Sequence, residues 1–272
     1  MICETISLRE EYPLLAGKNM TPALTVYAVT PPQEAIDINR PAVLICPGGG
    51  YGFVSPREAE PVALHYVKAG FNCFVLDYTV HPNGRYPQQI LEAACGVDLI
   101  RKHQEKWNLN GKIAVVGFSA GGHLAASYSV LWNHADIQEK FNAQPVDAAV
   151  LSYPVLSAGD YAHSGSIYNL LGHEPSGAEK EKFSLQNRVT KDTVPTFLWH
   201  TAADAAVPVE NTLLYAMALR KQQVPFEVHI YPEGAHGLST ADELSCNGVT
   251  EDHRYAQNWI DHSICFLRKY ML

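Results

Sequence analysis

The sequence lacks the features that mark secreted and membrane-bound proteins. Its 272 residues include six cysteines but no C-x-x-C pair, which favours reduced thiols over a disulfide framework. No run of 18 apolar residues occurs, so no membrane-spanning helix is predicted. The first residues lack a basic stretch followed by an apolar one, the pattern of a signal peptide. These absences predict a cytoplasmic protein with no membrane partner.

Clusters of basic residues and metal-binding spacings are missing as well. The formal net charge is −8 and no stripe of lysine and arginine occurs, which argues against a nucleic-acid partner. There is no H-E-x-x-H motif and no Cys/His cluster with zinc spacing, and the glycines at 48–50 are not followed by the Gly-Lys-Ser/Thr of a phosphate-binding loop. We therefore expect no metal and no cofactor. Composition leaves the oligomeric state open.

Apolar residues are plentiful, at 47%, and they fall into short runs between helical patterns. Near-continuous apolar content predicts strands buried on both faces of a parallel sheet. These strands are expected at 42–46, 71–78, 113–118, 148–153 and 194–200, and an alternating edge strand at 226–231. Helices are expected at 58–69, 87–107, 120–132, 209–222 and about 251–270. The alternation predicts a mostly parallel, doubly wound α/β sheet flanked by helices.

The stretch at about 155–192 interrupts this rhythm. It is polar and contains AGDYAHSGS and EPSGAEKEK between two predicted strands. A connection of that length in a compact domain usually has a function. We expect a partly helical, cap-like insertion over the carboxyl ends of the strands, within a single domain that spans 1–272. Whether the insertion moves is left open.

A possible nucleophile lies at a predicted strand-to-helix junction. The segment IAVVGFSAGG places Ser119 in a G-x-S-x-G pattern, in which flanking glycines let the strand and the helix approach closely. Asp204 follows the strand TFLWH, and His236 follows the edge strand. Open α/β sheets form their sites at the carboxyl ends of strands, so these three residues are expected to meet, with Ser119 as nucleophile, His236 as base and Asp204 as acid. Glu210 and Asp242 are the alternative acids.

Hydrogen-bond donors for an oxyanion are predicted from a glycine-rich loop. The segment PGGGY follows the strand at 42–46 directly, and its glycines expose backbone N–H groups. Ala120, the residue after the nucleophile, supplies a further N–H group.

Together, PGGGY, GFSAGG, DAAVP and GAHGLS resemble, in order and spacing, the α/β-hydrolase esterases related to bacterial acetyl-xylan and feruloyl esterases, and more distantly the hormone-sensitive-lipase group. The resemblance covers about residues 23–271. It implies that Ser119, Asp204 and His236 form the triad, and that the N–H groups of Gly49, Gly50 and Ala120 form the oxyanion hole. Two departures are Pro47, where the lipase group often has histidine, and Ala203, where related sequences often have an acidic residue.

The expected activity is hydrolysis of a small carboxylic ester through an acyl-enzyme. The insertion is too polar to cover a long acyl chain, which favours acetyl groups. Tyr51, Tyr161 and His163 could contact a sugar-like alcohol, such as an acetylated oligosaccharide, although the aromatic rings could equally serve packing. A peptidase or lactonase on the same scaffold, or a binding protein with a hydrolase fold and no catalysis, are the alternatives.

Overall fold

One eight-stranded sheet forms the centre of the molecule. The structure is a computed structural model that describes all residues except 16, 18, 20, 31–37 and 246–250. The strand order is β1-β2-β4-β3-β5-β6-β7-β8. The strands are β1 (Ile2–Ser7), β2 (Ala23–Ala28), β3 (Arg40–Cys46), β4 (Asn72–Asp77), β5 (Leu109–Phe118), β6 (Ala148–Ser152), β7 (Thr196–Thr201) and β8 (Phe226–Tyr231).

The sheet is parallel from β4 to β8 and antiparallel at its other end. Adjacent strands in the series β4, β3, β5, β6, β7 and β8 pair in parallel, whereas β2 runs antiparallel to both β1 and β4. The predicted doubly wound α/β sheet is therefore confirmed, with each expected strand present. The two N-terminal strands were not predicted. Their apolar runs are short, and β1 is exposed at alternate residues because it lies at the edge.

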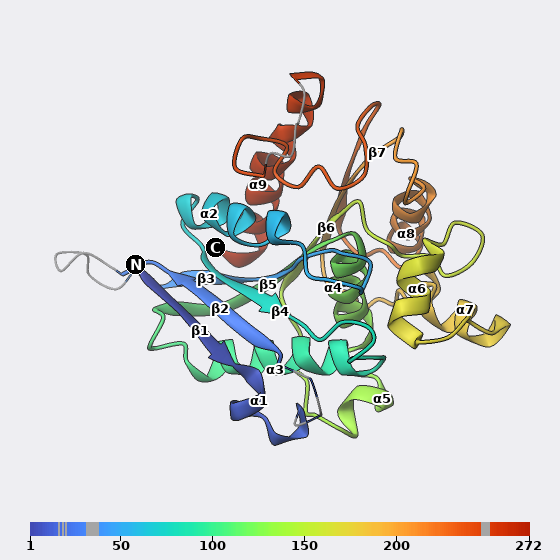
Figure 1. Cartoon of the computed structure of the whole chain (residues 1–272). Coiled ribbons are helices and arrows are strands. Elements are labelled where there is room, and N and C mark those ends of the chain that lie inside the picture. Colours follow the sequence, from blue (N-terminus) through green and yellow to red (C-terminus); the bar gives the residue numbers. More distant parts are fainter. Residues whose placement is uncertain (16, 18, 20, 31–37, 246–250) are drawn as a thin grey trace.

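Helices cover both faces of the sheet (Figure 1). Residues of α2 and α9 pack on one face, and residues of α3, α4 and α8 pack on the other. The α-helices are α1 (Leu8–Glu11), α2 (Glu60–Lys68), α3 (Gln88–Lys102), α4 (Ser119–Leu131), α5 (Ala135–Gln138), α6 (Ser164–Leu171), α7 (Gly177–Phe183), α8 (Glu210–Lys221) and α9 (Trp259–Met271). Short 3₁₀ helices are η1 (Pro13–Leu15), η2 (Pro56–Glu58), η3 (Leu185–Asn187) and η4 (Glu251–Asn258).

Two expected helices have different bounds from those predicted. The helix expected at 87–107 ends at Lys102, and Asn108 then takes a positive φ of 49° that turns the chain into β5. The closing helix expected from about 251 begins as the 3₁₀ helix η4 and becomes α-helical only at Trp259. Both ends are set by local backbone turns, which apolar periodicity does not report.

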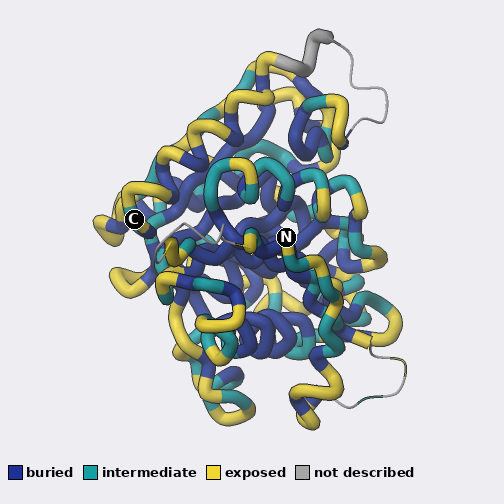
Figure 2. The backbone as a smooth tube through the Cα atoms, turned by 90° about the vertical axis from the view of Figure 1, so that its left-hand side faces the viewer, coloured by how far each residue is buried: buried dark blue, intermediate teal, exposed yellow. Residues whose placement is uncertain are grey.

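The central strands are buried on both faces, as their composition predicts. In the view of Figure 2 the buried, dark-blue part of the tube runs through the middle of the molecule, with exposed segments around it. Every residue of β6 and β7 is buried. Burial at about 25 cal/mol per Å² of apolar surface makes these strands a rigid support for the loops that follow them.

The edge strand β8 is present, but its faces are the reverse of the usual arrangement. The apolar Val228 and Ile230 are 36% and 39% exposed. His229 lies against the ring of Phe197, and Tyr231 lies against Trp199, on the side that α9 covers. Alternation therefore identified the strand correctly, whereas the packing of α9 decided which face is covered.

The insertion at 155–192 is partly helical, as expected, and contains α6, α7 and η3. Asn169 of α6 donates from Nδ2 to the carbonyl oxygen of Gly50, at 2.9 Å, so α6 lies against the glycine-rich loop that follows β3. The insertion is thus placed beside the carboxyl ends of the strands.

Five of the six cysteines lie among the described residues. Cys3, Cys46, Cys73, Cys95 and Cys265 form no disulfide with one another and are free. Cys246 lies outside the described residues. Among the residues that the structure describes, no helix is long and apolar enough to cross a membrane.

Candidate active site

Ser119 lies in a strained turn between β5 and α4. Its φ is 52°, a left-handed conformation that lifts the side chain out of the path from strand to helix. A Cβ on Gly117 would lie 2.3 Å from the carbonyl oxygen of Gly121, and a Cβ on Gly121 would lie 2.1 Å from that of Cys46. Glycine is therefore required on both sides of Ser119, and the predicted strand-turn-helix context is present.

Three predicted residues meet at this turn in a chain of short hydrogen bonds. The Oγ of Ser119 lies 2.7 Å from Nε2 of His236, and Nδ1 of His236 lies 2.6 Å from Oδ2 of Asp204. A neutral His236 that accepts the hydroxyl proton at Nε2 carries its own proton at Nδ1 and donates it to the carboxylate. Ser119 is 7% exposed, and the side chain of His236 is 22% exposed. The arrangement can therefore transfer a proton from serine to histidine with the carboxylate orienting the ring.

The carboxylate of Asp204, in the loop after β7, has four donors within reach, two from that loop and two from histidines. Its Oδ1 accepts the backbone N–H groups of Ala206 and Val207, both at 2.9 Å. Its Oδ2 lies 2.6 Å from Nδ1 of His236 and 3.3 Å from Nε2 of His200. Burial alone would raise the pKa of Asp204, but the hydrogen bonds from the two histidines and from Val207 outweigh it and hold the pKa well below the ordinary value. Asp204 is therefore ionised at neutral pH.

The two alternative acids lie elsewhere. Asp242 accepts from Nε2 of His65 at 2.7 Å and from the hydroxyl of Thr240, so its carboxylate is engaged away from His236. Glu210 begins α8. The geometry thus favours Asp204 as the partner of His236.

The glycine-rich loop lies directly against the turn that holds Ser119. A Cβ on Gly48 would lie 3.0 Å from Cβ of Ser119. Gly49 and Gly50 have φ values of 123° and 63°, which favour glycine. Within the described part of the chain, their N–H groups have no backbone or side-chain acceptor, and the N–H of Ala120 lies in the first turn of α4, where no intrahelical acceptor exists. These three donors are available to a bound anion.

Tyr51, predicted as a possible substrate contact, supports this loop from beneath. Its side chain is 1% exposed, and its hydroxyl donates to Nδ1 of His123 at 2.9 Å. Burial lowers the pKa of His123 to about 4, so the ring is neutral and can accept that proton. The buried pair of Tyr51 and His123 therefore supports the loop, and Tyr51 is not exposed to a substrate as predicted.

A buried carboxylate that the sequence did not single out joins the two loops of the site. Glu58 is 3% exposed, and its Oε2 accepts the N–H of Gly48 at 2.8 Å while Oε1 accepts the hydroxyl of Tyr153 at 2.6 Å. The hydroxyl oxygen of Tyr153 in turn accepts the N–H of Ser239, and its ring packs edge-on against His236, with centroids 5.0 Å apart. The Glu58 carboxylate therefore connects the glycine-rich loop to the loop that carries His236.

The neighbouring Arg57 fastens the same histidine loop. Its guanidinium donates to the carbonyl oxygen of Gly237 at 2.7 Å and to that of Ser245 at 2.9 Å. Its own carbonyl oxygen accepts the hydroxyl of Ser239 at 2.6 Å.

Burial raises the pKa of Glu58, although its hydrogen bonds from Tyr153 and Gly48 and the nearby positive charges oppose this.

The two predicted contacts from the insertion differ in their placement. Tyr161 is 39% exposed, and its carbonyl oxygen accepts from Asn211. His163 begins α6, where its Nδ1 accepts the N–H of Ser166. Because a backbone N–H can only donate, the neutral ring carries its proton on Nε2. Burial, together with the electrostatic effect of His236, lowers the pKa of His163.

One of the supporting residues, His200, had a signal in the sequence. It ends a predicted strand whose preceding residues are apolar, and a polar residue in such a place is buried only with partners. Glu58 lies in the polar stretch SPREAE and has no such signal. His200 is fully buried at the end of β7, with its Nδ1 beside the hydroxyl of Thr212 and its Nε2 beside the carbonyl oxygen of Val207. The same Nε2 lies 3.3 Å from Oδ2 of Asp204, so His200 also supports that carboxylate.

The fold and the site geometry can now be compared with known proteins. The BD-FAE family model matches residues 24–219, which is most of the chain. The chain belongs to the BD-FAE family. Its eight-stranded sheet has the α/β-hydrolase fold, since MGS-M1, a solved alpha/beta hydrolase enzyme from a Medee basin deep-sea metagenome library, superposes with a TM-score of 0.77 at 30% identity, over 100% of this chain and 98% of that one. A solved acetyl ester-xyloside bifunctional hydrolase from Caldicellulosiruptor lactoaceticus superposes with a TM-score of 0.85 at 35% identity, over 98% of this chain and 96% of that one.

Two curated relatives of this BD-FAE chain carry names from xylan degradation. The endo-1,4-beta-xylanase B of Butyrivibrio fibrisolvens is 36% identical over 90% of the chain, and the acetylxylan esterase of Xylanibacter ruminicola is 30% identical over 72%. The chain spans only 39% and 41% of the length of these two proteins.

Proposed function

We propose that this chain is a serine carboxylic ester hydrolase in which Ser119, His236 and Asp204 act as nucleophile, base and orienting acid. One observation carries the proposal, namely the continuous path from Oγ of Ser119 through His236 to Asp204, with contacts of 2.7 and 2.6 Å. Proton transfer needs donors and acceptors within about 2.6–3.2 Å, and both contacts satisfy this condition. The esterase names of the solved neighbour and of the acetylxylan esterase relative support the same reaction class.

The reaction proceeds in two halves. As the oxygen of Ser119 attacks the ester carbonyl, its proton passes to Nε2 of His236, and the carbonyl electron pair becomes an oxyanion. The N–H groups of Gly49, Gly50 and Ala120 stabilise that anion. When the intermediate collapses, the ester C–O bond breaks and His236 returns the proton to the departing alcohol, which leaves an acyl-enzyme. Water, which gives a proton to His236, then attacks the acyl carbonyl. As the bond between the acyl carbon and the oxygen of Ser119 breaks, His236 returns that proton to Ser119, and the carboxylic acid is released.

The substrate that we infer is a short acyl ester, above all an acetyl ester, of a carbohydrate. Polar groups of the insertion lie next to the glycine-rich loop: Asn169 binds the carbonyl oxygen of Gly50, and a Cβ on Gly50 would lie 3.7 Å from the hydroxyl of Ser166, which is hydrogen-bonded to His163. Such groups suit a hydroxylated alcohol better than a long acyl chain. The name of the acetylxylan esterase supports an acetylated xylan fragment. The xylanase B relative is a longer protein, and this chain spans only 39% of its length. Its name is therefore no argument for glycosidase activity in this chain.

Two alternative functions are possible on the same scaffold. A peptidase or lactonase would use the same nucleophile on another acyl group, because fold and triad do not determine the leaving group. A protein that only binds a ligand would have no need for a serine held in a strained turn against a histidine.

The proposal is tested in two steps. A fluorophosphonate probe should label the wild-type chain at Ser119 and should not label Ser119→Ala, whereas absence of labelling would favour the binding protein. Turnover is then measured on p-nitrophenyl acetate, butyrate and octanoate, and as acetate released from acetylated xylo-oligosaccharides. We expect kcat/KM to fall with acyl length and acetate to be released. Octanoate as the best ester, with the sugars untouched, would refute the substrate class while leaving the nucleophile assigned.

A further inference from the structure

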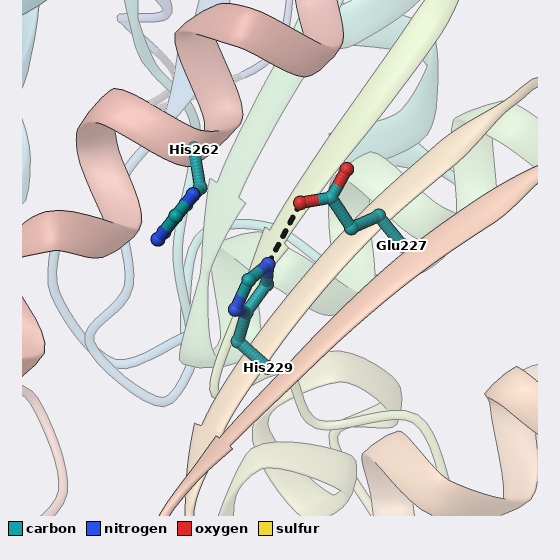
Figure 3. Close-up of side chains that lie close together, drawn as sticks. All are labelled: Glu227, His229 and His262. Atoms are coloured by element: carbon teal, nitrogen blue, oxygen red, sulfur yellow. Dashed lines mark hydrogen bonds and ion pairs between the residues drawn. The ribbon is translucent and has the colours of Figure 1, made fainter.

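Three side chains that can bind a metal ion lie together on β8 and α9, outside the hydrogen-bond chain of Ser119. Glu227 and His229 are two residues apart on β8 and therefore point to the same face of the strand, and His262 reaches them from the first turn of α9 (Figure 3). Nε2 of His229 lies 2.7 Å from Oε1 of Glu227. The two imidazole rings stack, with centroids 4.6 Å apart and an angle of 18° between planes.

The donor set fits zinc better than the harder divalent cations. Zinc accepts histidine nitrogen at about 2.0–2.1 Å and carboxylate oxygen at about 2.0–2.2 Å, whereas magnesium and calcium prefer oxygen alone. Around a tetrahedral ion with such bonds, neighbouring ligand atoms lie about 3.4 Å apart. The three ligand atoms here lie within 4.8 Å of one another, so the widest separation must close by roughly 1.4 Å and the shortest must open by less.

The surroundings allow that adjustment without moving the backbone. The side chains of Glu227 and His229 are 41% and 27% exposed, so they can rotate and an ion can reach them from solvent. The ring of Phe197 packs against the ring of His229, with centroids 5.2 Å apart. Strand β8 is held by its pairing with β7, and α9 is held by the packing of Trp259 and Phe266 on the sheet. The two supports of the cluster are therefore fixed relative to each other.

We propose that Glu227, His229 and His262 bind one zinc ion, with water as the fourth ligand, and so connect the edge strand to the last helix. The sequence predicted no metal because no zinc spacing is present, and only the packing of α9 on β8 brings His262 to the other two. An ion that binds the folded chain and not the unfolded one stabilises the fold by mass action, so occupancy is expected to raise the melting temperature. The proposal does not depend on the esterase activity.

The test is calorimetric titration of zinc chloride into the full chain after removal of metals with a chelator. We expect one ion per chain with a dissociation constant of micromolar order, and at least a tenfold weaker binding in His262→Ala and in Glu227→Gln. His173→Ala is the matched control, because His173 is also exposed and pairs at 2.9 Å with a single carboxylate, that of Glu179. Its affinity for zinc is expected to equal that of the wild type.

Thermal melting and active-site labelling give the second readout. Zinc should raise the melting temperature of the wild type and of His173→Ala, but not that of His262→Ala. Titration of chain labelled with a fluorophosphonate should give the same affinity as unlabelled chain. Binding that disappears on labelling would place the ion at His236 instead, and binding that is absent below millimolar zinc, or unchanged in His262→Ala, would overturn the proposal.

Discussion

Replacing Glu58 by glutamine removes one acceptor from the bridge between the two loops of the site. Both carboxylate oxygens of Glu58 accept a hydrogen bond, one from the N–H of Gly48 and one from the hydroxyl of Tyr153. Glutamine has the same shape but offers one oxygen and one NH₂ group. Gly48 can only donate, and the hydroxyl oxygen of Tyr153 already accepts from Ser239. One of the two donors must therefore lose its partner.

The size of the effect follows from the lost bond. A hydrogen bond to a charged group contributes about 1.5–3 kcal/mol, and each 1.36 kcal/mol of barrier corresponds to about tenfold in rate. If the loops must keep their positions chiefly in the transition state, kcat should fall by roughly 10- to 100-fold in Glu58→Gln. KM should change by less than about threefold, since Glu58 is buried behind the loops and has no access to substrate.

The assay measures kcat and KM with p-nitrophenyl acetate in the wild type, in Glu58→Gln and in Glu60→Gln. Glu60 carries the same change on the exposed start of α2 and should behave like the wild type. Thermal melting of each variant establishes that the chain is folded. A value of kcat within twofold of wild type, or a loss expressed only in KM, would refute the positioning role of Glu58.

The pH profile separates the charge of Glu58 from its packing. Burial raises the pKa of this carboxyl, so lowering the pH protonates the wild-type residue and makes it neutral, like glutamine. The ratio of wild-type to Glu58→Gln activity should therefore narrow as the pH falls toward that raised pKa. A ratio that stays constant from about pH 8 to about pH 5 would assign the effect to packing alone.

Three further outcomes are expected. Ser119→Ala should lower kcat by about four orders of magnitude or more with its fold unchanged, measured by acetate release and circular dichroism, and retention of a tenth of the activity would remove Ser119 as nucleophile. Asp204→Asn should lose about 10³- to 10⁴-fold in kcat and Asp242→Asn little, and the reverse order would move the acid role. Because the pKa of Asp204 lies below its ordinary value, the contribution of its charge to stability is present at neutral pH and is lost as the pH falls through the folded-state pKa. In urea titrations, the difference in unfolding free energy between wild type and Asp204→Asn should therefore shrink below about pH 4. A difference that is independent of pH would contradict this account.

The sequence by itself determined the parallel sheet and the residues that meet at its carboxyl edge. Strands buried on both faces must be apolar along their whole length, and the turn at Ser119 has no room for a Cβ at Gly117 or Gly121, so both features leave local patterns. The order of Ser119, Asp204 and His236, each after a strand, then follows from the rule that such sheets form their sites at one edge.

Only the tertiary structure decided which residues support that site. Glu58 and Tyr153 are far apart in the sequence, and no periodicity links them, yet the fold brings the carboxylate to the hydroxyl at 2.6 Å. The exposed face of β8 and the meeting of His262 with His229 depend on where α9 packs, which is a contact between distant segments. Local propensity and spacing describe what one element can do, whereas burial of a charged or polar side chain depends on partners that only the assembled fold supplies.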